Sequence, residues 1–231
     1  MLERKIISTE DGSSTLFIPE WNESYHSRHG AIQEAYHVFI QNGLDNFSDQ
    51  KEVSILEIGL GTGLNALISC TEAIFNKQHL RYTGIEKYPL RNEEYAQLNY
   101  PESLFAHKPD LPISEEEMSD FYTKMMQADW EVENQIHPLF QLEKIQADFL
   151  SYSYPKERFD LVYFDAFGAR VQPELWTEEL FVKLHQALKT NGLLTTYSAK
   201  GSVRRALKEV GFEVQKRPGP PGKREMLIAR K

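Results

Sequence analysis

Short apolar runs alternate with amphipathic stretches of helical length along most of the chain. One run, FDLVYF at residues 159–164, is almost continuously apolar, which is typical of a strand in the middle of a sheet that is covered on both faces. Strands that alternate with helices predict an α/β fold with a mostly parallel sheet. We expect seven strands, at residues 53–58, 80–86, 140–147, 159–164, 192–199, 212–217 and 225–229.

The helices expected between these strands follow from helical spacing and from turn residues. A helix is expected over residues 64–75, directly after a glycine-rich turn, and leucines recur at helical spacing over residues 173–188. Pro89 suits the first turn of a helix that follows the second strand, and another helix should open after Lys200. Helices on both faces predict a Rossmann-like, doubly wound sheet in a single domain that spans residues 1–231.

Residues 1–50 are expected to form an N-terminal hairpin and helix added to this core. Two β-prone runs flank Asp11-Gly12, which is a strong hairpin signal. Residues 21–44 then show helical spacing of apolar residues. Four polar or aromatic residues of this segment are candidates for a lid over a ligand, with helix capping and packing as the alternative: Glu23, Tyr25, His26 and Glu34.

Residues 101–138 interrupt the regular alternation before the third strand. They contain several prolines and an acidic run that begins at Ser114. A serine followed by glutamates is typical of a helix N-terminus, because the hydroxyl caps the first turn and the acidic side chains favour the helix dipole. We therefore expect an insertion with one or two helices.

The glycine motif after the first strand is the strongest chemical signal. Residues 57–63 read EIGLGTG, and glycines allow positive φ and the close approach of a ligand. The helix that follows directs free backbone N–H groups toward such a ligand. The spacing G-x-G-x-G differs from the dinucleotide and P-loop motifs, which disfavours an NAD-dependent dehydrogenase. A turn without any ligand is the alternative.

Acidic residues end three of the expected parallel strands. Glu86 lies about twenty residues after the glycine loop, where a carboxylate binds ribose hydroxyls in Rossmann-type sheets. Asp148 and Phe149 could bind the amino group and the ring of an adenine, although an aspartate here could also cap a turn. Asp165 ends the strand expected beside the first one, where the strand order reverses and ligands bind.

Charge and composition narrow the classes further. The formal net charge is -8, but residues 200–231 carry ten Lys or Arg against three Glu, a charge of +7 that leaves -15 for the remainder. A basic face on an acidic body could contact a polyanion, although an ordinary solvated surface is the alternative. No cysteine or carboxylate cluster joins the histidines, so we expect no metal. A single cysteine, no apolar run of membrane-spanning length and no signal peptide predict a cytoplasmic protein without membrane contact.

Several stretches together resemble the MnmC-like family, the methyltransferase half of a bifunctional enzyme that completes 5-methylaminomethyl-2-thiouridine in tRNA. The resemblance runs from about residue 20 to the C-terminus, and its last stretches are the most specific. The stretches are EIGLGTGLNAL (57–67), IEKYPL (85–90), YFDAF (163–167), PELW (173–176), TYSAKGSVRRALKEVGFEV (196–214) and GKREML (222–227).

The resemblance implies a class I methyltransferase with S-adenosyl-L-methionine as cofactor and tRNA as partner. The methyl acceptor would be the aminomethyl group of a modified wobble uridine. Asp165 would orient the amine and Phe167 would stack on the base. The expected cofactor-binding residues are Glu57, Gly59, Gly61, Gly63, Leu64, Asn65, Glu86, Lys87, Asp148, Phe149 and Asp165. The expected RNA-binding residues are Lys200, Arg204, Arg205, Lys223 and Arg224.

Two departures from the family pattern leave alternatives open. Gly168-Ala169 stands where the family usually has Ala-Pro, and the chain has no second glycine-rich fingerprint for a flavin domain. A stand-alone methyltransferase would need a separate oxidoreductase partner to supply the aminomethyl precursor. The alternatives are a methyltransferase acting on a small molecule or a protein, which the acidic net charge favours, and a non-catalytic cofactor-binding or scaffold protein.

Overall fold

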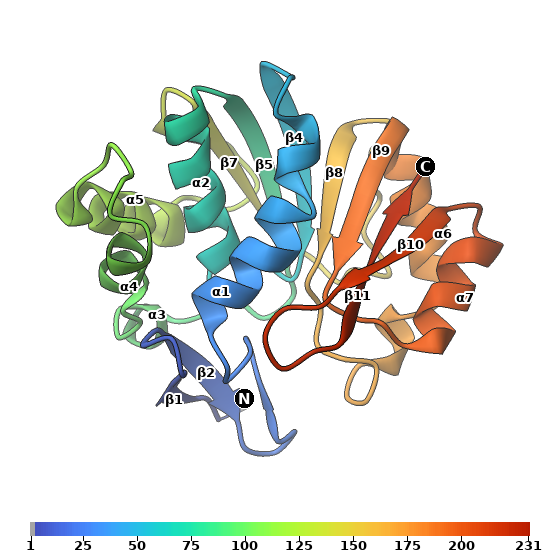
Figure 1. The fold of residues 1–231 in the computed structure, drawn as a ribbon, viewed down its shortest axis with the longest axis horizontal. Coiled ribbons are helices and arrows are strands. Elements are labelled where there is room, and N and C mark those ends of the chain that lie inside the picture. Colours follow the sequence, from blue (N-terminus) through green and yellow to red (C-terminus); the bar gives the residue numbers. More distant parts are fainter. Residues whose placement is uncertain (1–2) are drawn as a thin grey trace.

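The core of the protein is an eight-stranded sheet with helices on both faces (Figure 1). The computed structural model describes residues 3–231. The strand order is β10-β11-β9-β8-β4-β5-β7-β6, and the five strands from β9 to β7 are parallel. The strands are β4 (Glu52–Ile58), β5 (His79–Glu86), β6 (Glu133–His137), β7 (Phe140–Gln146), β8 (Phe159–Phe164), β9 (Leu188–Thr196), β10 (Glu213–Pro218) and β11 (Glu225–Arg230).

The seven expected strands are all present, but the expected strand count is wrong. The eighth strand, β6, lies inside the expected insertion at residues 101–138 and pairs antiparallel with β7 at the sheet edge. Its side chains are mostly exposed or half-buried, so no run of apolar residues marked it as a strand. The insertion therefore supplies two helices and an edge strand. Ser114 caps the second of these helices as expected, since its hydroxyl accepts a hydrogen bond from the backbone N–H of Glu117.

The N-terminal hairpin is confirmed, whereas the expected helix from residue 21 is wrong. Strands β1 (Lys5–Ser8), β2 (Ser14–Ile18) and β3 (Glu23–Ser24) form a separate antiparallel sheet. Helix α1 (Ala31–Ala35) begins ten residues later than expected and continues as a π-helical segment over Tyr36–Gln41. The segment before it cannot be helical, because its backbone bonds this small sheet: the N–H of Tyr25 donates to the carbonyl of Leu16 (2.9 Å).

The remaining helices divide between the two faces of the sheet (Figure 1). Helices α1, α2, α4 and α5 pack on one face, and α6 and α7 pack on the other. The helix expected directly after β5 starts later, as α3. The chain first bends, and the backbone N–H of Tyr88 in this bend donates a hydrogen bond to the carboxylate of Glu86. The helices are α2 (Leu64–Asn76), α3 (Asn92–Tyr95), α4 (Tyr100–His107), α5 (Glu115–Gln127), α6 (Glu178–Ala187) and α7 (Gly201–Glu209).

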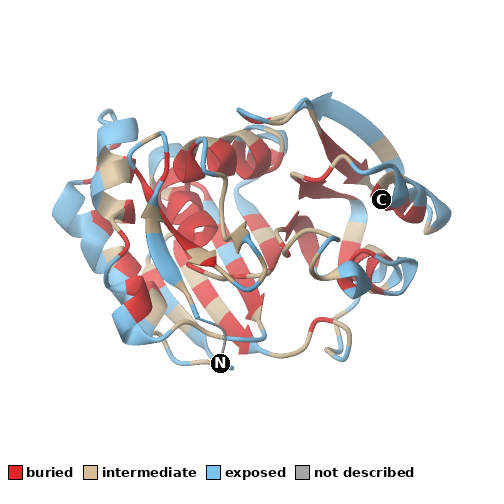
Figure 2. Cartoon of the chain, turned by 90° about the horizontal axis from the view of Figure 1, so that it is seen from below, coloured by how far each residue is buried: buried red, intermediate tan, exposed pale blue. Residues whose placement is uncertain are grey.

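Burial follows these layers (Figure 2). Every residue of β8 is buried, as expected for a central strand with helices on both sides. Two apolar clusters, one on each face, form the core. In the described residues, no helix is long and apolar enough to cross a membrane.

The topology brings the ends of two central strands together. Strands β4 and β8 are parallel neighbours with Ile58 opposite Phe164, and the N–H of Asp165 donates to the carbonyl of Ile58 (3.0 Å). The chain runs from β4 to β5 on one side, and β8 lies on the other, so the strand order reverses at this point. A crevice for ligands is expected there.

Candidate active site

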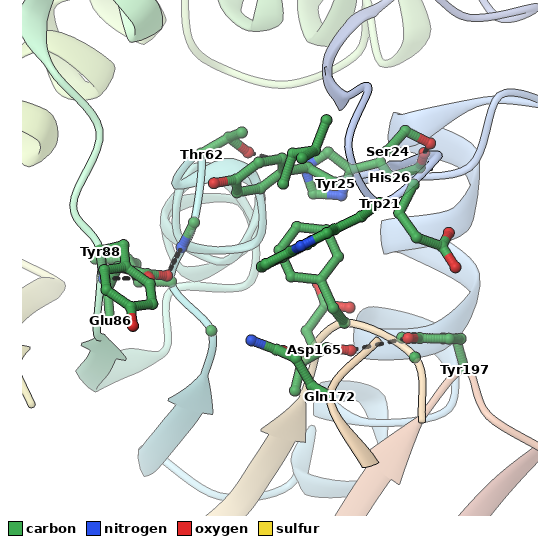
Figure 3. Close-up of a pocket in the computed structure, with 18 of the residues that line it drawn as sticks. Trp21, Ser24, Tyr25, His26, Thr62, Glu86, Tyr88, Asp165, Gln172 and Tyr197 are labelled. Atoms are coloured by element: carbon green, nitrogen blue, oxygen red, sulfur yellow. Dashed lines mark hydrogen bonds between the residues drawn. The ribbon is translucent and has the colours of Figure 1, made fainter. Parts of the chain in front are cut away.

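A cavity of about 220 Å³ lies at the carboxyl ends of the central strands (Figure 3). Its walls come from the glycine loop, from the ends of β5, β8 and β9, and from the N-terminal segment. Predicted site residues from five segments line it: Gly59, Gly61, Glu86, Lys87, Phe149, Asp165, Phe167 and Lys223. Glu86 and Asp165 thus face one cavity, although 79 positions separate them in the sequence.

The glycine loop forms one wall because its backbone takes conformations that side chains disfavour. Gly59, Gly61 and Gly63 all have positive φ. A Cβ on Gly59 would lie 2.9 Å from the carbonyl oxygen of Asp165, and one on Gly61 would lie 3.1 Å from the ring of Tyr25. The loop can therefore approach both β8 and the N-terminal segment closely only with glycine at these positions.

The carboxylate of Glu86 is fixed beside the loop. Its two oxygens accept hydrogen bonds from the backbone N–H groups of Gly61 (3.0 Å) and Tyr88 (2.8 Å). Burial raises its pKa, and these backbone bonds act in the opposite direction. Each carboxylate oxygen can accept a second hydrogen bond, so Glu86 retains acceptors for a ligand's hydroxyl groups.

Asp148 lies beside the cavity, and its neighbour Phe149 lines it. The carboxylate of Asp148 pairs with Lys87 (2.7 Å) and accepts the backbone N–H of Leu150 (2.9 Å). The ion pair with Lys87 lowers the pKa of Asp148. The alternative of a turn-capping aspartate is thus realised in the structure, while the buried ring of Phe149 forms an apolar wall.

Asp165 lines the cavity, and two buried polar side chains, Asn65 and Glu57, lie behind it. Its carboxylate accepts a hydrogen bond from the amide of Asn65 (2.8 Å), which also donates to Glu57 (2.8 Å). Burial is the main cause that raises the pKa of Asp165 to about 7, and the charge of Glu34 adds to it. Burial and the charge of Asp165 also raise the pKa of Glu57 well above its usual value. Glu57 and Asn65 thus support Asp165 from behind the cavity wall.

Three aromatic rings gather at one side of the cavity. Phe167 contacts Trp21 and Tyr25 edge to face, with ring centroids 5.3 and 4.9 Å apart. Figure 3 shows Trp21 and Tyr25 beside each other above Asp165. Two of these rings come from the N-terminal segment, so the added small sheet completes the cavity wall.

Glu23, Tyr25, His26 and Glu34, which the sequence suggested as a lid, all line the cavity. His26 is held against the glycine loop through Thr62, whose hydroxyl lies 2.8 Å from its Nε2. Burial lowers the pKa of His26 to about 4, so its ring is neutral near pH 7. Helices α4 and α5 meet the same residue, since Tyr100 donates to the Thr62 hydroxyl and Tyr122 to its carbonyl.

The predicted RNA-binding residues separate into two groups. Lys223 lines the cavity, where it pairs with Glu34, whereas the other four lie outside it. Those four are Lys200, Arg204, Arg205 and Arg224; Lys200 precedes α7, only four residues after the end of β9. Arg204 and Arg205 follow in the first half of α7, and Arg224 directly precedes β11, whose Leu227 lies opposite Thr196 at the end of β9. All four therefore lie near the carboxyl end of β9, at the same end of the sheet as the cavity.

A family model described as S-adenosyl-L-methionine-dependent methyltransferase matches residues 117–231, the C-terminal half of the chain. This chain belongs to that family. Its cofactor is accordingly S-adenosyl-L-methionine. The family model covers Asp165 and the strands after it, while the glycine loop and Glu86 precede the matched region.

Similar proteins match nearly the whole of this methyltransferase chain, including the part that precedes the family model. The tRNA 5-methylaminomethyl-2-thiouridine biosynthesis bifunctional protein MnmC of Cupriavidus metallidurans is 30% identical over 97% of this chain and 33% of its own length. That of Leptospira interrogans is 29% identical over 90% and 32%. The chain thus spans about one third of these relatives. The crystal structure of MnmC2 from Aquifex aeolicus superposes with a TM-score of 0.77 at 24% identity, covering 99% of this chain and 70% of that one, which confirms the fold.

The cavity of this methyltransferase fits an adenosyl cofactor. Glu86 keeps free acceptors, Gly59 and Gly61 add no side chain to the wall, and Phe149 offers an apolar wall. Five of the expected cofactor residues do not line the cavity: Glu57, Gly63, Leu64, Asn65 and Asp148. Gly63 and Leu64 begin α2, with Gly63 as its N-cap. No group of three or more His, Cys, Asp or Glu suited to a metal ion occurs in residues 3–231.

Sequence reasoning missed several residues that line the cavity. Tyr197 directly follows β9, so the rule that identified Asp165 at a strand end could have found it. Tyr88 lies two residues beyond Glu86 and forms the outer wall beside it (Figure 3). Arg4, Trp21 and Gln172 carried no signal, because they reach the cavity only through the packing of distant segments.

Proposed function

We propose that this methyltransferase acts on tRNA and methylates the primary amine of an aminomethyl group on a modified wobble uridine. The observation that carries the proposal is Asp165, a carboxylate with a pKa of about 7 that lines the cavity next to the glycine loop. Relatives named for tRNA 5-methylaminomethyl-2-thiouridine biosynthesis match nearly the whole chain, which supports this choice of acceptor.

The cofactor would be held by groups at separate strand ends. When bound, S-adenosyl-L-methionine supplies a methyl group on a positively charged sulfur. Glu86 would accept hydrogen bonds from the ribose hydroxyls. Phe149 would pack on the adenine, and the free acceptor positions of Asp148 would bind its amino group.

Asp165 would prepare the acceptor. A protonated amine has no lone pair, so the ammonium must first give one proton to the Asp165 carboxylate. The freed nitrogen lone pair would then accept the methyl group that the cofactor supplies, and the electron pair of the C–S bond would stay on sulfur. The product ammonium can lose a proton to water. Alignment of the amine with the methyl group supplies most of the remaining rate enhancement.

The base and the backbone of the RNA would contact different parts of the site. Phe167 would stack on the uridine, and Trp21 beside it extends the aromatic surface. A base in an anticodon loop can leave the stack and enter such a cavity. The basic residues at the same sheet edge would bind phosphates, namely Lys200, Arg204, Arg205 and Arg224.

Two further expectations follow from a tRNA acceptor. A separate oxidoreductase activity would supply the aminomethyl precursor, as the resemblance to the bifunctional family implies. The reaction would take place in the cytoplasm, where mature tRNA is found.

The test is mass spectrometry of tRNA nucleosides from cells with and without this protein. We expect the unmethylated aminomethyl nucleoside to accumulate in its absence, and purified protein to convert it when S-adenosyl-L-methionine is added. Unchanged tRNA nucleosides would exclude this acceptor. Bulk tRNA binding that does not fall with salt would instead favour a small molecule or a protein as acceptor.

A further inference from the structure

Among the five predicted RNA-binding residues, only Lys223 places its side chain in the active-site cavity. Its Nζ forms an ion pair with Glu34 and lies 4.0 Å from the centre of the Tyr197 ring. The Glu34 side chain is only 10% exposed, and the Lys223 side chain is 35% exposed. Lys223 and Glu34 both perturb the pKa of Asp165, so the pair lies within electrostatic reach of the proposed acceptor of the proton.

The fold builds this arrangement from three separate segments. Glu34 of α1 is oriented by its other oxygen, which accepts the backbone N–H of Ser27 (2.8 Å). The hydroxyl of Tyr197 donates to the carbonyl of Ala166 (2.8 Å), which fixes its ring beside Asp165. Lys223 reaches them because Gly222, at positive φ, lets the β10–β11 turn lie against His29; a Cβ there would overlap the imidazole.

A carboxylate next to an aromatic face is a site for an alkylammonium group. The carboxylate supplies charge and hydrogen-bond acceptors, and the face of the ring attracts cations. The ammonium that now fills the site belongs to Lys223, which is attached through a turn between β10 and β11. Another alkylammonium of the same charge and size could replace it without leaving Glu34 unpaired.

The geometry points to Glu34 and the Tyr197 ring as the binding site for the protonated amine of the methyl acceptor, with Lys223 occupying that site until the acceptor enters. This inference rests on the proposed function only in taking the acceptor to be an amine. The exchange keeps one positive charge beside Glu34 and brings the acceptor nitrogen next to Asp165. Lys223 would then move out toward the basic edge of the sheet.

Ethylammonium binding to the protein saturated with S-adenosylhomocysteine tests the site. The titration is followed by calorimetry, with sodium chloride exchanged for ethylammonium chloride at constant ionic strength. Lys223→Met removes the resident ammonium. If Lys223 fills the site about nine-tenths of the time, its removal should lower the apparent Kd for ethylammonium about tenfold. The double variant Lys223→Met/Glu34→Gln should lose this gain.

A matched control is available on the same hairpin. Lys216 and Glu225 form a similar ion pair (2.7 Å), but neither lines the cavity. Lys216→Met, with or without Glu225→Gln, should leave the Kd for ethylammonium unchanged. Equal affinities in wild type and Lys223→Met, or a gain that survives the loss of Glu34, would overturn the inference.

A second measurement uses the wild-type protein and does not depend on the folding of any variant. Ethylammonium should inhibit methyl transfer in competition with tRNA and leave the KM for S-adenosyl-L-methionine unchanged. Inhibition that instead competes with S-adenosyl-L-methionine, or no inhibition, contradicts the inference. If tRNA is not methylated at all, the proposed function fails, while the calorimetric result still decides whether the ammonium site exists.

Discussion

Asp165 determines what the active site can do near neutral pH. Its carboxylate must be ionised to accept a proton, and its pKa is about 7. The rate should therefore rise with pH through about 7, while an asparagine at this position has no such titration. Asp165→Asn should lower kcat by about 10²-fold or more, because proton transfer by a positioned group contributes that much. The Kd for S-adenosyl-L-methionine should change little.

The measurement is a pH profile of single-turnover methyl transfer, with calorimetry of cofactor binding for both proteins. Glu23→Gln provides a comparison, because Glu23 also lines the cavity but forms an ion pair with Arg170 (2.9 Å) rather than bonding Asn65. Its profile should keep the limb near pH 7. Wild-type turnover in Asp165→Asn would remove Asp165 from the mechanism.

The same pKa shift predicts a cost in stability. Folding raises the pKa of Asp165 from its ordinary value of 3.8 to about 7, so the native state binds more protons than the unfolded state between these values. Protonated Asp165 therefore favours the folded state at low pH, and this stabilisation is lost as the pH rises through about 7. Asp165→Asn should therefore stabilise the protein above pH 7, on the order of 1–3 kcal/mol. Urea unfolding of both proteins at pH 5 and pH 8 measures this; a difference that does not grow with pH would contradict it.

The glycine loop anchors three other segments of the chain, which all form hydrogen bonds with Thr62. His26 and Tyr100 bond its hydroxyl, and Tyr122 bonds its carbonyl. Thr62→Val keeps the shape but leaves the half-buried His26 ring and the buried Tyr100 hydroxyl without this partner. We expect a loss of about 1–3 kcal/mol in the free energy of unfolding and weaker cofactor binding. Thr71→Val is a matched control within α2, since its hydroxyl donates to the local carbonyl of Ile68 and does not contact the glycine loop.

Denaturant unfolding and calorimetry distinguish the expected outcomes. If Thr62→Val weakens cofactor binding more than Thr71→Val does at similar stability, the anchoring of the loop matters for the site. If both variants lose only stability, the contacts at Thr62 are structural. Equal stability of Thr62→Val and wild type would show that the three contacts contribute nothing.

A substitution within the loop tests its backbone directly. Gly59→Ala would place a Cβ 2.9 Å from the Asp165 carbonyl at a positive φ of 92°. Both the overlap and the strain oppose the native loop, at a cost of about 1–3 kcal/mol. The Kd for S-adenosyl-L-methionine should rise at least about tenfold, as calorimetry can measure. Gly201→Ala, at a helix start with no atom nearer than 3.4 Å, should bind the cofactor normally.

The elements that sequence could predict are those whose signals are local. Buried strands such as β8 are almost entirely apolar, and Glu86 and Asp165 follow from their positions at strand ends. Strand β6 has few buried residues, and its pairing with β7 is the only reason it is a strand. The start of α1 was misplaced because helical spacing cannot reveal that the preceding residues bond the N-terminal sheet. The position of Lys223 depends on contacts between residues nearly 200 positions apart, which no local pattern reveals.

At the scale of the whole molecule, positive charge is concentrated in the C-terminal segment, part of which borders the active site. Residues 200–231 carry +7 on a body of -15, and four of their basic residues, Lys200, Arg204, Arg205 and Arg224, lie near the carboxyl end of β9, where the cavity opens. Long-range attraction would draw a polyanion to this edge and repel it elsewhere. The small N-terminal sheet and the β10–β11 turn meet across this edge, so RNA and acceptor amine would enter beside the Lys223–Glu34 pair (Figure 1).

This distribution predicts the salt dependence of tRNA binding. Arg204→Ala/Arg205→Ala should weaken binding at low salt and reduce the slope of log K against log salt by about two, because each phosphate contact releases about one counterion. The Kd for S-adenosyl-L-methionine should not change, since neither residue lines the cavity. Lys77→Ala/Lys124→Ala, at the ends of α2 and α5 and away from the basic tail, removes the same charge as a control. Equal effects of the two double variants would mean that net charge, rather than a defined phosphate-binding edge, holds the RNA.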